Sequence, residues 1–79
     1  MTIKELRQYV VDETNDFYFD YNGENCGVEQ TVKDSYPTYI MWYGDKDKEF
    51  HDFNTVVSDK FFDGKSIADL IDTLEIRFV

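Results

Sequence analysis

The segment at residues 38–43 (TYIMWY) constrains the fold most, because it is short and apolar or aromatic at nearly every position. Such a segment is typical of a central β-strand that has a core on one side and aromatic side chains on the other. Pro37 stands at its entrance, where a missing backbone donor is tolerated. Residues 44–48 predict a polar turn, and residues 49–53 predict the returning strand of a hairpin.

A second aromatic segment, residues 17–21, alternates with a period of two, as a half-buried strand does. Asn22 and Gly23 follow it, a dipeptide that readily adopts positive φ and turns a hairpin. We expect residues 22–27 to form a loop and residues 28–32 to form the return strand of this hairpin.

The first residues predict a short helix that fades near residues 13–15. Thr2 and Glu5 have the spacing of a capping box, in which each side chain binds a backbone donor that the helix leaves unpaired. Apolar side chains then recur at helical spacing, at Ile3, Leu6 and Val10.

The apolar period changes again from Phe53 onward, where one helix face would carry Phe53, Val56, Val57, Lys60 and Phe61. Either Asn54 or Asp52 is expected to cap this helix, because both side chains accept bonds from backbone donors. Gly64 stands where a helix commonly ends in a left-handed residue.

A last helix is predicted after Ser66 and Asp69, which repeat a capping-box spacing. Its apolar stripe would be Ile67, Leu70, Ile71 and Leu74. Residues 75–79 alternate once more and predict a short terminal strand, with an extension of the same helix as the alternative.

These elements fit one α+β domain spanning residues 1–79. We expect an N-terminal helix, an antiparallel sheet of three to four strands, and C-terminal helices packed on one sheet face. No apolar run reaches the roughly 18 residues of a membrane span, and the first residues lack the apolar stretch of a secretory signal. The expected location is therefore the cytoplasm, without a disulfide framework, since there is a single cysteine.

Catalytic and metal-binding patterns are weak in this chain. No serine lies in a nucleophile-elbow context that could pair with His51, the one histidine. His51 is therefore interpreted as a partly exposed strand residue. Cys26 is interpreted as a passive loop thiol, because nearby acids raise rather than lower a thiol pKa. The acids of residues 45–49 resemble the opening of a calcium loop, but Phe50 and Val56 stand where Gly and Glu are needed. We expect no enzyme activity, no cofactor and no metal.

An acidic stretch without any basic residue runs between Arg7 and Lys33 in a chain of formal net charge −9. Such charge excludes ordinary nucleic-acid binding, which needs a basic face. One interpretation is a surface that only keeps the protein in solution. The other is a docking surface whose carboxylates occupy a groove that normally holds phosphates. The acids of this stretch are Asp12, Glu13, Asp16, Asp20, Glu24 and Glu29.

Aromatic residues, seven Phe, six Tyr and one Trp, exceed what so small a core encloses. Either their rings are buried with wet hydroxyls, or they anchor an interface. Stacking of single-stranded bases is disfavoured, because it needs positive charge beside the rings. We therefore expect some of five aromatic residues to be exposed at the surface: Tyr18, Tyr36, Tyr39, Trp42 and Tyr43.

Residues 60–70 (KFFDGKSIADL) resemble the C-terminal tails of small uncharacterised acidic proteins of Gram-positive bacteria and their phages. This resemblance implies no activity. In size, acidity and lack of catalytic motifs the whole chain is similar to phage inhibitors that mimic DNA, including some anti-CRISPR proteins. That likeness of character implies a basic protein partner but assigns no residue a role.

The leading hypothesis is a non-enzymatic protein-binding domain, a phage or mobile-element inhibitor that covers a basic nucleic-acid-binding surface. Its partner would be a basic protein, such as a nucleic-acid-binding enzyme, with no direct contact to nucleic acid or membrane. The alternative is an accessory module that binds through an aromatic face around Tyr39, Trp42 and Tyr43, as a monomer or a homodimer. The residues predicted to bind the partner are Asp12, Glu13, Asp16, Tyr18, Asp20, Glu24, Glu29, Asp45, Asp47 and Glu49.

Overall fold

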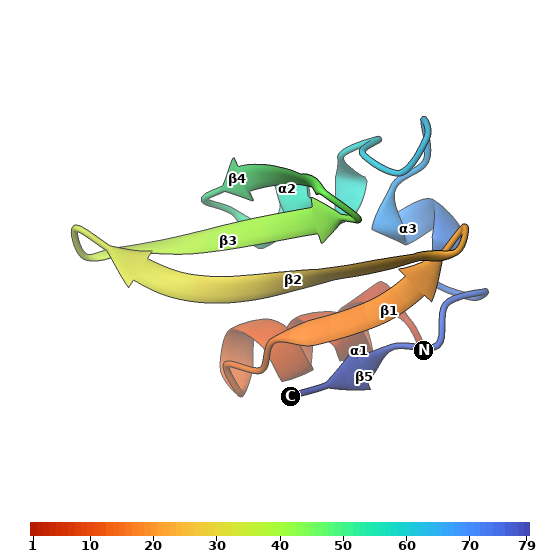
Figure 1. Ribbon diagram of the computed structural model, residues 1–79. Coiled ribbons are helices and arrows are strands. Elements are labelled where there is room, and N and C mark those ends of the chain that lie inside the picture. The colour runs from red at the N-terminus through yellow and green to blue at the C-terminus, as the bar shows by residue number, and fades with distance from the viewer.

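The computed structural model describes residues 1–79 and shows an α+β fold built on a five-stranded antiparallel sheet (Figure 1). The sheet order is β4-β3-β2-β1-β5, so the first four strands form consecutive hairpins and the last returns to pair with β1. The predicted class is confirmed, with five strands in place of three or four. The strands are β1 (Phe17–Tyr21), β2 (Glu24–Lys33), β3 (Tyr36–Tyr43), β4 (Lys46–Phe50) and β5 (Arg77–Phe78).

Side-chain caps define the starts of the helices. Thr2 and Glu5 form the predicted capping box at the N-terminal helix, with bonds of 3.1 and 2.9 Å. Of the two predicted caps for the next helix, Asp52 is the one used. None of the helices has the length and apolarity to cross a lipid bilayer. The helical segments are α1 (Ile3–Arg7), a π-helical turn η1 (Gln8–Asp12), α2 (Phe53–Ser58) and α3 (Ile67–Leu70).

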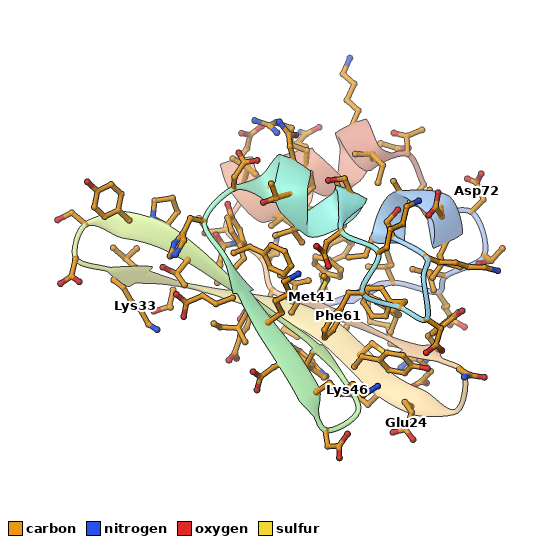
Figure 2. The ribbon with its side chains drawn as sticks, turned by 90° about the horizontal axis from the view of Figure 1, so that it is seen from above. Glu24, Lys33, Met41, Lys46, Phe61 and Asp72 are labelled. Atoms are coloured by element: carbon orange, nitrogen blue, oxygen red, sulfur yellow. The ribbon has the colours of Figure 1, made fainter.

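One face of the sheet contributes to a core of 17 buried side chains that also includes residues of every helical segment. The strand register produces this face, because Phe17, Val28 and Met41 lie opposite one another on adjacent strands. In Figures 1 and 2 the helices all lie on one side of the sheet. The buried residues of the sheet are Phe17, Phe19, Cys26, Val28, Tyr39, Met41, Tyr43 and Phe50.

The predicted loop at residues 22–27 is wrong, because β2 begins at Glu24. Asn22 and Gly23 have φ values of 54° and 78° and close the hairpin by themselves. The residues after them therefore continue the ladder, with Glu24 opposite Tyr21. Cys26 consequently lies in a strand and faces the core.

The second hairpin is also tighter than predicted. β4 covers Lys46–Phe50, so the connection shrinks from residues 44–48 to Gly44 and Asp45, and the strand does not reach residue 53. β4 is an edge strand, where charged side chains are tolerated because their ends reach water. The polar residues that predict a turn therefore pair with β3 instead.

The C-terminal third departs from the predicted helix limits. α2 ends at Ser58, and Gly64 does not end it. Asp63 and Gly64, with φ values of 55° and 84°, instead turn the chain between Phe62 and Lys65, which exchange two backbone bonds of 2.9 and 3.0 Å. Lys60 and Phe61 accordingly lie outside the helix.

The terminal strand is the correct alternative for the last residues. The α-helix begun by the Ser66–Asp69 capping box ends at Leu70, and β5 then pairs with β1. Phe78 lies opposite Phe17 and stacks on Tyr9, with ring centroids 4.4 Å apart. These contacts hold the C-terminal strand at the edge of the sheet.

Candidate partner-binding face

The sheet face opposite the core, named here the open face, carries no covering element (Figure 1). Alternation along each strand directs a second set of side chains to it. Its aromatic and apolar members are half-buried, whereas its carboxylates are exposed. The residues of the open face are Tyr18, Asp20, Asn25, Gly27, Glu29, Thr31, Lys33, Tyr36, Thr38, Ile40, Trp42, Asp47, Glu49 and Arg77.

Two rows of cross-strand neighbours organise the open face. In the first, defined as the aromatic row, residues from all five strands lie opposite one another: Arg77, Tyr18, Gly27, Trp42 and Asp47. In the second, Glu29, Ile40 and Glu49 lie side by side on β2, β3 and β4. An apolar centre with acidic flanks results, which is the composition of many protein-binding surfaces.

Trp42 packs closely against β2 because its neighbour there is a glycine. A Cβ atom at Gly27 would lie 2.4 Å from two atoms of the indole ring, so only a hydrogen leaves room for the ring. The indole Nε1 donates a 2.9 Å hydrogen bond to Asn25 Oδ1. These two contacts fix the position and orientation of the ring.

Tyr18 carries a cation at the other end of the row. The Arg77 guanidinium lies 5.5 Å from the centre of the Tyr18 ring. An Arg77 terminal nitrogen also lies 3.6 Å from Asp20 Oδ2. The chain therefore fills this position with its own ring, guanidinium and carboxylate.

The structure brings only half of the predicted partner-binding residues together. Tyr18, Asp20, Glu29, Asp47 and Glu49 share the open face. The others lie elsewhere, because strand register and not sequence distance decides which side chains are neighbours.

The remaining predicted residues form two smaller groups. Asp12 and Glu13 lie at the end of η1, near Asp16, whose Oδ1 accepts a 2.9 Å bond from the Gln30 backbone. Glu24 and the β3–β4 turn residue Asp45 line a shallow depression beside Tyr43. The expectation of one continuous patch over residues 12–29 is thus replaced by three separate acidic regions.

Some carboxylates on the open face form an ion pair with a basic side chain, and others do not. Glu49 lies 2.9 Å from Lys33, whose hydrogen bond lowers the pKa of the Glu49 carboxyl. Glu29 and Asp47 form no ion pair. Two free negative charges therefore stand on either side of Trp42, one on β2 and one on β4.

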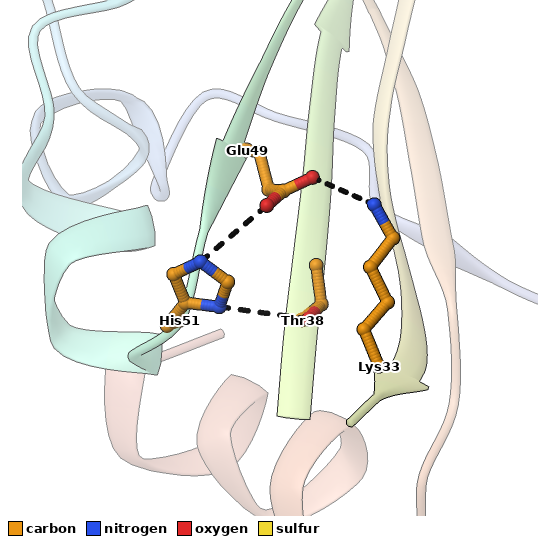
Figure 3. Close-up of polar contacts among 4 residues, drawn as sticks. All are labelled: Lys33, Thr38, Glu49 and His51. Carbon is orange, nitrogen blue, oxygen red and sulfur yellow. Dashed lines mark hydrogen bonds and ion pairs between the residues drawn. The ribbon is translucent and has the colours of Figure 1, made fainter. Parts of the chain in front are cut away.

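His51 forms a chain of polar contacts that sequence reasoning missed (Figure 3). Its Nδ1 lies 3.5 Å from Thr38 Oγ1, and its Nε2 lies 3.4 Å from Glu49 Oε2. Hydroxyl, imidazole and carboxylate occur in this order in hydrolase triads. Thr38 is completely buried, however, so its hydroxyl has no surface at which to meet a substrate. Moreover, His51 lies one residue beyond β4 and is exposed, which corrects its predicted strand position.

One thiol and one hydroxyl in the core, those of Cys26 and Tyr43, have raised pKa values. Burial raises the pKa of the Cys26 thiol to about 11. The Tyr43 hydroxyl donates a 2.7 Å bond to Asp63, and this bond raises the pKa of the tyrosine. Both groups are therefore held in their neutral forms at neutral pH, as structural side chains are.

Comparison with known protein families, curated proteins and solved structures found no match to this chain.

Proposed function

We propose that this protein is a non-enzymatic binding domain that docks its open face onto a basic, nucleic-acid-binding surface of another protein. The single observation that carries the proposal is the aromatic row, which crosses an uncovered sheet face and places Trp42 beside the unpaired carboxylates of Asp47 and Glu29. Aromatic side chains supply contact area at low entropic cost, and the carboxylates supply the charge that a basic surface requires.

An inhibitory role fits this binding mode. A partner that normally holds phosphates would offer arginine and lysine side chains, and an acidic domain seated on them would exclude the nucleic acid. Phage and mobile-element inhibitors, including the anti-CRISPR class, act on partners of this kind. We assign the protein to that type of function, with the open face as the occluding surface.

The alternative of a dimer through Tyr39, Trp42 and Tyr43 has less support. Tyr39 and Tyr43 are buried on the core side, and only Trp42 belongs to the open face. Two copies that met through their open faces would also bring like charges together, which costs free energy. An acidic surface of this kind favours a partner of opposite charge.

A capture experiment with matched charge reversals tests the proposal. Immobilised wild-type protein is compared with the double variants E29K/D47K, on the open face, and D12K/D45K, away from it. Both variants change the net charge equally. The wild type and D12K/D45K should retain a nucleic-acid-binding host protein, identified by mass spectrometry, that elutes with rising salt and is released by duplex DNA.

The E29K/D47K variant should lose this capture, because it places positive charge on both sides of Trp42. Equal capture by all three proteins would contradict the open face as the binding surface. A captured protein that duplex DNA does not displace would contradict the occlusion of a nucleic-acid site.

A further inference from the structure

The chain contains an internal example of cation recognition on the open face. Tyr18, Asp20 and Arg77 combine a ring, a carboxylate and a guanidinium that lies 5.5 Å from the ring centre. A guanidinium stacks on an aromatic ring through its flat face and bonds a carboxylate through its edge. This arrangement shows which ligand an aromatic ring and a carboxylate accept on this sheet.

Trp42 presents the same combination with the cation missing from this chain. Asp47 is its direct neighbour on β4, and Glu29 follows two residues after Gly27 on β2. Neither carboxylate forms an ion pair. The cations that do lie over rings contact other residues: Phe53, Tyr43, Phe50 and Tyr18.

The indole is already fixed for such a ligand. Two atoms of its six-membered ring lie against Gly27, and its Nε1 donates a hydrogen bond to Asn25. A ring that is fixed before binding loses little conformational entropy when a ligand stacks on it. Tryptophan is also the aromatic side chain that attracts cations most strongly.

We propose that the outer face of the Trp42 indole binds an arginine side chain of the partner, with Asp47 or Glu29 as its carboxylate partner. This inference rests on the proposed function and names the group that the open face recognises. Arginine is specified over lysine because only a planar guanidinium can stack on the ring and also form two parallel bonds to a carboxylate.

Short basic peptides of equal charge test the inference. Fluorescently labelled hexa-arginine and hexa-lysine are titrated with the protein at low salt, and binding is followed by fluorescence anisotropy. We expect hexa-arginine to bind about two- to fivefold more tightly, the range that one exposed cation–π contact supplies. Equal affinities, or no binding of either peptide, would overturn the inference.

The Trp42→Leu variant tests whether the preference for arginine over lysine arises at the indole. It should lose most of the arginine preference, because the carboxylates remain and the stacking ring is gone. Tyr36→Leu is the matched control, since it removes an exposed aromatic ring at the far end of β3 and should keep the arginine preference. An arginine preference as large in Trp42→Leu as in the wild type would overturn the inference.

Nuclear magnetic resonance on the wild-type protein measures peptide binding at Trp42 directly, without a variant. The Trp42 ring protons should shift more with hexa-arginine than with hexa-lysine, because only the guanidinium stacks on them. Shifts confined to residues outside the aromatic row would contradict the site.

These outcomes separate the inference from the function on which it rests. If the peptides bind equally and E29K/D47K abolishes both, arginine recognition fails while the acidic docking face stands. If arginine preference is found but no basic host protein is captured through the open face, the binding site stands and the proposed function fails.

Discussion

Gly27 determines where the Trp42 ring lies on the open face, because the absence of a side chain at Gly27 leaves room for the indole. The indole covers the glycine backbone, and its Nε1 bonds Asn25 on the same strand. The Phe17 carbonyl oxygen approaches the same position from β1, at 2.5 Å from where a Cβ atom would lie. Neighbouring strands thus crowd this one residue from two sides.

A Gly27→Ala substitution should therefore lower the free energy of unfolding by about 1–3 kcal/mol, the usual cost of overpacking a close contact. Urea denaturation measures the change. In a Trp42→Leu background the cost should be smaller but not zero, because the ring clash is relieved and the Phe17 carbonyl remains. An identical cost in both backgrounds would show that the indole does not lie on Gly27.

At the scale of elements, α2 and α3 have only six and four residues, so their stability depends on what holds their ends. Ser66 and Asp69 form a capping box at α3, with bonds of 2.9 and 3.1 Å. Lys60 in the preceding connection lies 2.6 Å from Asp69. The Lys60 bond, with smaller contributions from Ser66, lowers the pKa of Asp69 from 3.8 to about 2.

This shift predicts a pH dependence of stability. The native carboxyl has a lower pKa than the unfolded one, so its contribution is complete above pH 3.8 and is lost as the pH falls towards about 2. In Asp69→Asn, the free energy of unfolding should be lower at neutral pH and should fall less over that acidic range. Urea denaturation across a pH series tests this. Asp72→Asn, an exposed neighbour in the same segment, should retain the wild-type acid dependence.

At the scale of the whole molecule, a net charge of −9 works against compactness. The acids are spread over the surface, and most of those outside the open face have no cation beside them. Their mutual repulsion acts through solvent, where dissolved ions screen it. The same charge provides the long-range attraction that the proposed partner requires.

We therefore expect the free energy of unfolding to rise when sodium chloride is added, because screening weakens repulsion more than it weakens the few exposed ion pairs. Thermal denaturation over a salt series measures this. The D12N/E13Q variant, which removes two charges at the end of η1, should respond less to salt. Stability that decreases with salt would show instead that ion pairs dominate.

The sequence specifies the elements whose signals are local. The capping box of Thr2 and Glu5, the alternation of residues 17–21 and the apolar run at 38–43 each predict an element that the structure contains. The wrong limits arise where two residues complete a turn by themselves, as Asn22 and Gly23 do. Composition around a turn favours a longer loop, whereas positive φ at two adjacent positions is enough to reverse the chain.

For the candidate site, too, the sequence predicts the types of residue and the structure decides their positions. The acidic and aromatic excess that led to a docking hypothesis belongs to the sequence alone. Only the pairing register places Glu29 and Asp47 on one face with Trp42 and turns Tyr39 and Tyr43 to the other. A strand displaced by one residue would exchange the two faces. The amino acids thus set the charge and chemistry available for binding, and the sheet decided which of them meet, because neighbours across strands are fixed by hydrogen-bonded pairing and not by distance along the chain.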